Sequence, residues 1–493
     1  MRRLWPAFLA IGFVIFLFAT ALAAKTNTDD AQAQQLLQKH RQFVGWQLGD
    51  GTFRTMRVAG TVTDKHGKKL EDVAYSRSGL AFQETHTMLD QDNITSHSGF
   101  TGSVFWQCHI TGFTVPVYGE AAKALASYTM LMEEGTSGLP ATFRGDKNAG
   151  GRDVPVVRVT MLNGDPIDLY VDPATGAYVE AVVDPEGAFE TTYHILSYAD
   201  VSPGKKMIGS YRIDDSDDVH ANVKFAPNAP VSDEELHPPK PTASWSFFSD
   251  QPVPIRLTYD RILVDATVNG VKGTFILDTG SDAIRLDDRF ADRAKVPVLK
   301  GTSGASSLYG TVKERVRSVT EMNFGNAALQ NVLVYSEDFE RFGYRGLDAQ
   351  GYAGLIGADF FAGAIVKLDV YGSKMTIVDP NTDLSATTGI PIFVDLSDGE
   401  LTVPMTLDKS MTVNALLDTG NPGGILFSYD LVKKHEPFNP QTLALGPIRY
   451  TVGSWIGCCM GVDYALLGYD FFKHFDYVFD YPHGRIFLTP NKN

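Results

Sequence analysis

The sequence predicts a mainly β protein with about three folded units, the last two of which are related by an internal repeat. Three observations support this prediction. The chain has 493 residues, and a domain averages roughly 150 residues. Its 46 Gly and 25 Pro separate short runs in which apolar and polar residues alternate, the pattern of strands joined by turns. The triplet Asp-Thr-Gly occurs twice in the second half of the chain, each time within the same ordered set of motifs.

The composition excludes several classes of protein. With 44% apolar and 20% charged residues, the chain is neither disordered throughout nor a multi-span membrane protein. A net charge of -15 has the wrong sign for a nucleic-acid partner, because phosphate contacts require Lys and Arg. Three cysteines are too few for a disulfide framework, and they lack the spaced pairs of a zinc site. We therefore expect no metal and no cofactor.

Residues 1–24 have the layout of an export signal. Two arginines precede an apolar run that ends in Ala21-Leu22-Ala23, with small residues at the positions that a signal peptidase reads. Cleavage near Ala23 predicts a periplasmic or secreted bacterial protein. The alternative is an uncleaved anchor, because about 20 apolar residues just span a bilayer. In that case the signal segment would be the one attachment to the membrane.

Residues 25–225 predict a β-rich accessory domain. A helix is expected over 30–41 and another over 120–134. Short alternating runs at 154–159 and 167–171 end in turn residues, so they predict antiparallel strands.

A proline-rich linker is expected over residues 226–250. Its prolines and acidic residues favour a solvated, semi-rigid connection. The two copies of the repeat follow it, and the predicted lobes are 251–385 and 386–493.

Each copy of the repeat contains three motifs in the same order. A strand ending in Asp-Thr-Gly is followed by an apolar-apolar-Gly motif and then by a second apolar strand. One Asp-Thr-Gly is expected by chance roughly 0.1 times in a chain of this length. The motifs are Phe275–Ser281, Gly354–Phe361 and Val366–Tyr371 in the first copy, and Ala415–Asn421, Ala465–Phe472 and Tyr477–Tyr481 in the second.

The repeat presents Asp278 and Asp418 in equivalent positions. Asn269-Gly270 predicts a tight hairpin before the strand that delivers Asp278, and the following Gly280 lets backbone amides approach the carboxylate. If the copies pack about a pseudo-twofold axis, the two carboxylates meet and hold one proton between them. One then acts as a base toward water and the other as an acid toward a carbonyl oxygen, which suits amide hydrolysis.

Residues 252–493 resemble the pepsin and retropepsin superfamily of aspartic proteases, and more narrowly the bacterial secreted proteins with retropepsin-like lobes. The resemblance implies a bilobal pepsin-like acid-protease β fold, an endopeptidase activity and an extended peptide or protein substrate. It implies that the threonines brace the lobes and that Ser281 hydrogen-bonds the outer oxygen of Asp278. The implied site consists of the catalytic Asp278 and Asp418, the supporting Thr279, Gly280, Ser281, Thr419, Gly420 and Asn421, and a flap candidate, Tyr309.

Two details of this site differ from the family or need interpretation. Asn421 replaces the usual Ser, Thr or Ala after the second Asp-Thr-Gly; its amide can donate to the carboxylate as a hydroxyl does. Asp359 and Asp470 lie at predicted helix starts, where we expect them to be helix caps.

The N-terminal region resembles the outer-membrane lipoprotein carrier superfamily. The resemblance rests on a leading helix, on the segment from Gly99 to Trp106 and on Tyr170–Gly176. It implies an antiparallel β half-barrel with a few helices that shelters an apolar ligand. The alternative function is therefore a non-catalytic periplasmic protein that binds a lipid or apolar peptide. The domain is otherwise an accessory unit or a pro-segment removed near the linker.

Overall fold

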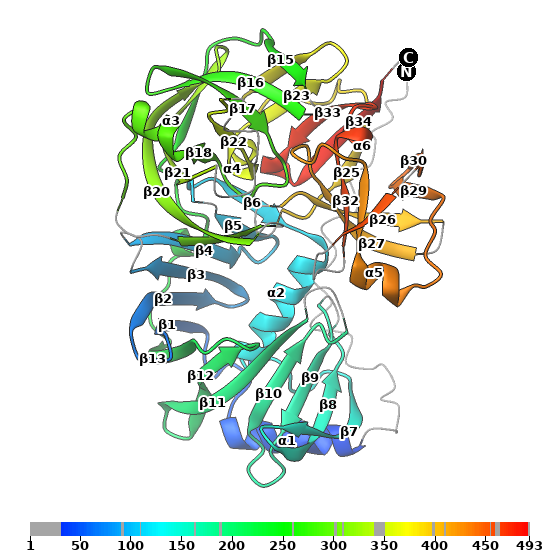
Figure 1. Ribbon diagram of the computed structural model, residues 1–493. Helices are drawn as coiled ribbons and strands as arrows, with labels where there is room; N and C mark the ends of the chain where they lie inside the picture. Colours follow the sequence, from blue (N-terminus) through cyan, green and yellow to red (C-terminus); the bar gives the residue numbers. More distant parts are fainter. Residues whose placement is uncertain are drawn as a thin grey trace, which may run out of the picture.

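The computed structural model describes residues 31–491, except for 90–92, 109, 162–163, 187–189, 259–260, 300–302, 308–309, 340–350, 397–399, 409–410, 454 and 459–463. The protein is mainly β, as predicted, and its strands form three sheets. Figure 1 shows one sheet in the N-terminal half of the chain and the other two above it.

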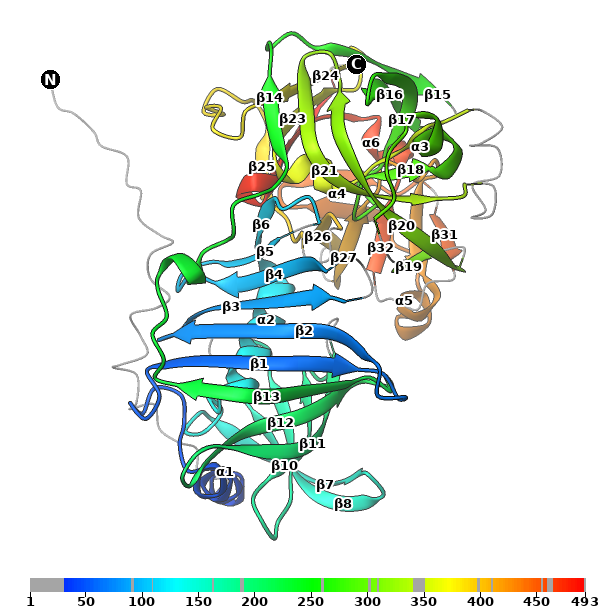
Figure 2. The same ribbon diagram turned by 90° about the vertical axis from the view of Figure 1, so that its left-hand side faces the viewer.

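The first sheet has thirteen strands and curls into a half-barrel (Figures 1 and 2). The chain runs outward from β1 to β6 at one edge, re-enters the sheet at β7 on the opposite edge and returns inward to β13 beside β1. From edge to edge the strands are β6 (Thr114–Val117), β5 (Phe105–Cys108), β4 (Ile94–Phe100), β3 (Ala81–Met88), β2 (Lys69–Ser78), β1 (Thr55–Thr63), β13 (Val219–Pro227), β12 (Lys205–Ile213), β11 (Thr191–Ser202), β10 (Tyr178–Val183), β9 (Ile167–Val171), β8 (Arg152–Val159) and β7 (Ala141–Ala149).

Two helices belong to this half-barrel. The helix α1 (Ala31–Val44) packs near β7 and β12, and α2 (Gly119–Met132) lies on the concave face of the sheet, as Figure 1 shows. Both helices were predicted from the sequence. Apolar residues of α1, α2 and strands β8–β12 form one core.

The second half of the chain forms a fourteen-stranded and a seven-stranded sheet. In the larger sheet β14 (Ser244–Phe247) pairs with β21, and the remaining order is β19 (Ser303–Ser307), β20 (Gly310–Asn323), β21 (Ala327–Glu337), β18 (Arg285–Asp287), β22 (Gly354–Ile356), β17 (Val271–Leu277), β16 (Arg261–Val268), β15 (Val253–Thr258), β24 (Lys374–Val378), β23 (Ile365–Asp369), β33 (Phe475–Asp480), β34 (Arg485–Pro490) and β25 (Ile390–Phe393). The smaller sheet contains β30 (Ile448–Thr451), β29 (Thr442–Leu445), β26 (Thr402–Leu407), β27 (Met411–Leu417), β32 (Tyr464–Leu467), β28 (Ile425–Ser428) and β31 (Trp455–Cys458).

The two copies of the sequence repeat fold in the same way. In the first copy β17 runs parallel to β22, and in the second β27 runs parallel to β32. A short helix follows β22 and β32 in turn: α4 (Ala358–Ala362) and α6 (Tyr469–Phe472). The copies join where β23 pairs with β33, with Val366 opposite Phe479. The last strands of the two repeats therefore share one sheet.

The predicted hairpin at Asn269-Gly270 is present. Val268 pairs with Val271, and both turn residues have positive φ, 48° and 81°. Two positive φ angles match the twist of the flanking strands, which is why Asn-Gly is favoured there.

The segment between the first and second sheets is held along its length. In Figure 2 it rises along one side of the molecule from β13 to β14. Arg57 donates hydrogen bonds to the Pro230 carbonyl and to Glu235, and Leu236 is buried. β14 then pairs with β21, so this proline-rich segment is anchored to both halves of the molecule.

The two halves also contact each other through apolar side chains. Phe113 and Val115, beside and within β6, belong to the same core as the C-terminal sheets, and Phe113 packs against Gly363. Tyr118 packs against Phe393 with ring centroids 6.0 Å apart. Burial of these residues fixes the half-barrel to the other sheets. Among the described residues, no helix is long and apolar enough to cross a membrane.

Candidate active site

Asp278 and Asp418 lie at equivalent ends of two buried strands. Asp278 directly follows β17, and its amide donates to the Ile356 carbonyl at 3.0 Å; Asp418 follows β27 and donates to Leu467 at 2.9 Å. Each aspartate is thus tied to the parallel strand beside its own. The adjacent glycine amides donate back to the carboxylates, from Gly280 at 3.1 Å and from Gly420 at 2.8 Å.

The threonines that follow the aspartates link the two repeats below the carboxylates. The Thr279 hydroxyl donates to the Leu417 carbonyl at 2.6 Å, and the Thr419 hydroxyl donates to Leu277 at 2.8 Å. Each threonine amide donates to the other hydroxyl, at 3.0 and 3.1 Å. Both residues are fully buried, so these four hydrogen bonds fix one turn against the other.

The glycines bring the carboxylates across the boundary between the repeats. A Cβ atom at Gly280 would lie 2.5 Å from Cγ of Asp418, and one at Gly420 would lie even closer to Asp278. Each carboxylate therefore packs against the backbone of the opposite turn. Only glycine leaves the space that this approach requires.

The two carboxyl groups have raised pKa values. Burial raises the pKa of Asp278, while hydrogen bonds from Asp418 and Gly280 and the charges of Arg285 and Arg261 act in the opposite direction. Burial raises the pKa of Asp418 further, together with the charge of Asp278. The pair therefore holds one proton, and the positive charges of Arg285 and Arg261 beside Asp278 favour its ionised form and leave the proton on Asp418.

Such a pair can carry out acid and base steps together. Ionised Asp278 can accept a proton from water, and protonated Asp418 can donate one to a carbonyl oxygen. Neither residue is fully buried.

The two residues that follow the glycines behave differently from the prediction. The Ser281 hydroxyl donates to the Ala283 carbonyl at 2.9 Å and accepts from Arg285 at 2.6 Å, so the expected bond to Asp278 is not formed. The hydroxyl has a single proton, and the Ala283 carbonyl accepts it while Arg285 donates to the oxygen, so none is left for Asp278. Asn421 donates to Asp418 through its backbone amide at 3.0 Å, not through its side chain.

The expected caps at Asp359 and Asp470 were also wrong. Gly357 and Gly468 occupy the cap positions of α4 and α6, without a side-chain hydrogen bond. Asp359 is buried, which raises its pKa well above the usual value. Asp470 is half-exposed and pairs with Lys473 at 2.6 Å.

The flap candidate, Tyr309, lies outside the described residues. The backbone on either side of it forms a hairpin, in which β19 pairs with β20 from Ser303 opposite Glu314 to Ser307 opposite Gly310.

Sequence reasoning missed Arg285, which lies in β18 between Ile284 and Leu286. Its side chain is only 10% exposed and reaches the turn that follows Asp278. The available signal was an arginine flanked on both sides by apolar residues, Ile284 and Leu286.

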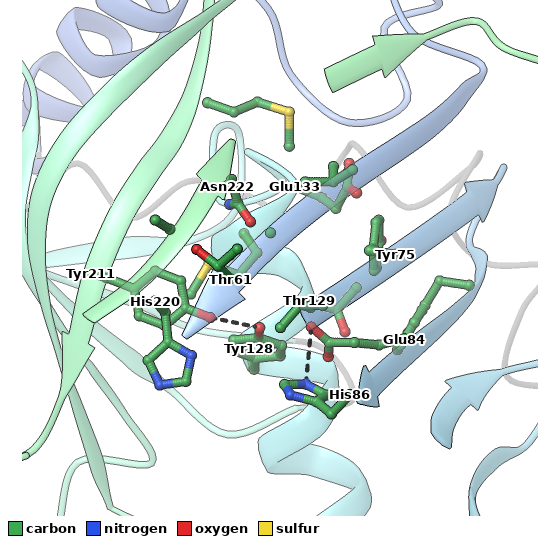
Figure 3. Close-up of a pocket in the computed structure, with 17 residues that line it drawn as sticks. Thr61, Tyr75, Glu84, His86, Tyr128, Thr129, Glu133, Tyr211, His220 and Asn222 are labelled. Carbon is green, nitrogen blue, oxygen red and sulfur yellow. Dashed lines mark hydrogen bonds and ion pairs between the residues drawn. The ribbon is translucent and has the colours of Figure 1, made fainter. Parts of the chain in front are cut away.

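The half-barrel contains a separate cavity between α2 and the concave face of strands β1–β3, β12 and β13 (Figure 3). Its volume is about 50 Å³. Arg77 and Glu133 form an ion pair beside it at 2.9 Å, and both are buried. Figure 3 shows His86 directed toward Glu84. Burial lowers the pKa of His86, but hydrogen bonds to Glu71 and Glu84 dominate and raise it to about 10. The cavity is small and its walls are partly charged.

Comparison with known proteins identifies part of the first repeat. Residues 264–360 match the family model of aspartyl proteases, which confirms the expected resemblance for this segment. The match includes Asp278 and ends at α4. An outer membrane lipoprotein-sorting protein domain from Vibrio parahaemolyticus is similar to 42% of this chain and 96% of its own, with 11% identity and a TM-score of 0.31. No curated protein matches the chain significantly.

Proposed function

We propose that this protein is an exported aspartic endopeptidase. The observation that carries the proposal is the pair of carboxyl groups that meet across the repeats, share a hydrogen bond and have raised pKa values. The match of residues 264–360 to aspartyl proteases supports the same reaction class.

The proposed reaction uses one water molecule for each peptide bond. Asp278 takes a proton from the water as its oxygen bonds to the carbonyl carbon, and Asp418 gives its proton to the carbonyl oxygen. The tetrahedral intermediate then collapses: Asp278 passes the proton taken from water to the amide nitrogen, the carbon–nitrogen bond breaks, and Asp418 regains its proton from a hydroxyl of the intermediate, which leaves a carboxylic acid and an amine. The bonds between Thr279 and Thr419 hold the two acids in place, because a shift of 1 Å can reduce such a rate about 100-fold.

The proposed location is the periplasm or the exterior of a bacterial cell. Its support is the arrangement of residues 1–24, with two arginines, an apolar run and small residues before the expected cleavage near Ala23.

A carrier function for the half-barrel has less support. Ligand pockets usually measure about 300–1,000 Å³, and the cavity measures about 50 Å³, enough for a few water molecules. A lipid chain would also contact the walls beside the buried Arg77–Glu133 pair.

A removable pro-segment is also less favoured. A cut within 226–250 leaves Phe113 packed on Gly363 and Tyr118 packed on Phe393, so the half-barrel would remain bound.

The proposed function is tested by incubating the mature protein with a peptide library from pH 3 to 8. Cleavage is expected for the wild type and is expected to fall at least 1,000-fold in Asp278→Asn and Asp418→Asn, because each removes one of the two proton-transfer groups. Asp470→Asn is the matched control, since this half-exposed carboxyl lies in the second repeat but pairs with Lys473. The proposal would be contradicted if the wild type cleaved no peptide, or if cleavage survived the substitution of either member of the dyad formed by Asp278 and Asp418.

A further inference from the structure

Arg285 lies at the junction of three parts of the first repeat. Its guanidinium Nη1 donates to the Ser281 hydroxyl at 2.6 Å and lies 2.6 Å from an oxygen of Asp282. Ser281 and Asp282 directly follow the Asp-Thr-Gly that contains Asp278. Arg285 therefore holds the outer side of the turn that presents this aspartate.

The same side chain reaches the base of the β19–β20 hairpin. Nε of Arg285 donates to Glu314 at 2.8 Å, and the Glu314 side chain is only 3% exposed. Glu314 pairs with Ser303 at the open end of the hairpin. A single buried guanidinium thus connects the dyad turn to the hairpin, and its planar fork suits two partners at once.

Charged and polar groups face Asp278 from four directions. Asp418 faces it from the end of β27, the Gly280 amide from its own turn, and the positive charges of Arg285 and Arg261 from β18 and β16. Around Arg285 itself lie Asp282, Glu314, Glu337, Asp359 and the ring of Tyr335, whose centroid is 5.6 Å from the guanidinium carbon.

In the second repeat a leucine occupies the position that corresponds to Arg285. Arg285 pairs with Leu355 in the first repeat, and Leu426 pairs with Leu466 in the second. Leu355 and Leu466 occupy the same place in the repeated motif, two residues before its glycine, so Leu426 corresponds to Arg285. The cation therefore lies on one side of the dyad.

We propose that Arg285 is a positioning residue that holds the Asp278 turn against the base of the β19–β20 hairpin and keeps Asp278 as the ionised member of the dyad. The inference rests on the proposed peptidase function. Arg285 touches the turn and the hairpin, and it acts on the reaction through Asp278.

The test compares the pH dependence of kcat/KM for Arg285→Met and Arg285→Lys. Without the cation, the pKa of Asp278 rises. The acid limb of the profile, where kcat/KM falls as Asp278 is protonated, should therefore move to higher pH in the Met variant. The expected shift is roughly half a pH unit or more, less than the 1–3 units typical of a direct ion pair. The Lys variant keeps the charge and should keep the wild-type limb. Its kcat should still fall about tenfold, because an ammonium cannot reproduce the fork.

Arg317→Met is the matched control. Arg317 is 3% exposed in the same sheet and is bound by Asp288, Asp292, Ser336 and the Val296 carbonyl. It should lose stability like Arg285→Met while its acid limb stays at the wild-type pH. An unchanged limb in Arg285→Met, or an equal shift in Arg317→Met, overturns the proposal.

Glu314→Gln is a second variant that tests the same proposal if Arg285→Met does not fold. It removes a negative charge beside Arg285, so the acid limb should move to lower pH, the opposite direction. No shift, or a shift to higher pH, overturns the proposal.

A second readout does not depend on cleavage. Burial raises the pKa of Asp278 above its unfolded value, so ionisation destabilises the fold increasingly as pH rises past about 4. Asp278→Asn should therefore gain stability over its parent between pH 3 and 7, and the gain should be larger in the Arg285→Met background. If Asp278→Asn gains the same stability in the wild-type and Arg285→Met backgrounds, the proposed role of Arg285 is wrong. If the gains differ but the wild type cleaves no peptide, only the peptidase function is contradicted.

Discussion

The two turns that carry the aspartates have the same backbone hydrogen bonds but different side-chain surroundings. In both turns the aspartate amide binds the neighbouring parallel strand, and the residue after the glycine donates its amide to the aspartate carbonyl, from Ser281 at 3.2 Å and from Asn421 at 3.3 Å. The first turn adds the buried Arg285 network, whereas the second has an apolar strand beside it. The backbone repeat thus sets where the acids lie, and the unique side chains make them unequal.

Adding a methyl group to either glycine of the two turns should have the largest effect on activity. Gly280→Ala and Gly420→Ala place a Cβ against the opposite carboxylate, so each should reduce kcat/KM at least 100-fold by displacing that acid. Gly423→Ala is the control, because its nearest neighbour, Oδ1 of Asn421, would be 3.4 Å away. Steady-state assays on a cleaved peptide measure the effect. Near-normal activity in either dyad glycine variant would show that the turns do not approach as described.

Removing the hydroxyls that join the two turns should lower the stability of the protein. Thr279→Val and Thr419→Val keep the side-chain shape but each leaves a buried amide and a buried carbonyl without a partner. Each should lower the free energy of unfolding by roughly 2–4 kcal/mol. Denaturant unfolding measures this, with Thr320→Val as a control on the exposed face of β20.

The double variant distinguishes a shared network from two separate ones. The two hydroxyls also hydrogen-bond each other at 3.4 Å, and either single variant already loses this bond, so Thr279→Val and Thr419→Val together should cost less than their sum. Strict additivity would indicate that each turn is held independently.

The sequence predicts the features of this site that are local. The Asp-Thr-Gly frames and the Asn269-Gly270 hairpin depend on neighbouring residues, so the equivalent presentation of Asp278 and Asp418 follows from pattern alone. The pairing of Arg285 with Glu314 joins residues 29 positions apart, and it depends on where two strands meet in the sheet. The guanidinium held by Glu314 also donates to the Ser281 hydroxyl, which gives its own proton to the Ala283 carbonyl, so the predicted hydrogen bond to Asp278 was wrong.

The burial of Asp359 has a similar cause. The helix α4 begins from an extended glycine, and Asp359 faces the interior instead of the helix end. A sequence pattern does not reveal which side of so short a helix is covered. The charged wall of the half-barrel cavity likewise combines residues from strands and a helix far apart in the chain.

The smallest effect is expected from replacing Asn421 with serine, the residue that follows Asp-Thr-Gly in the first repeat. The Asn421 Nδ2 atom is buried and has no hydrogen-bond partner among the described residues, while its backbone amide holds Asp418. Asn421→Ser should therefore change kcat less than tenfold and leave stability within about 1 kcal/mol. Ser281→Asn should be worse in both respects, because Ser281 is packed between Ala283 and Arg285. Parallel kinetic and unfolding measurements on the two variants test this order. A larger loss of kcat or stability in Asn421→Ser than in Ser281→Asn would contradict it and would show that the turn of the second repeat tolerates substitution less well.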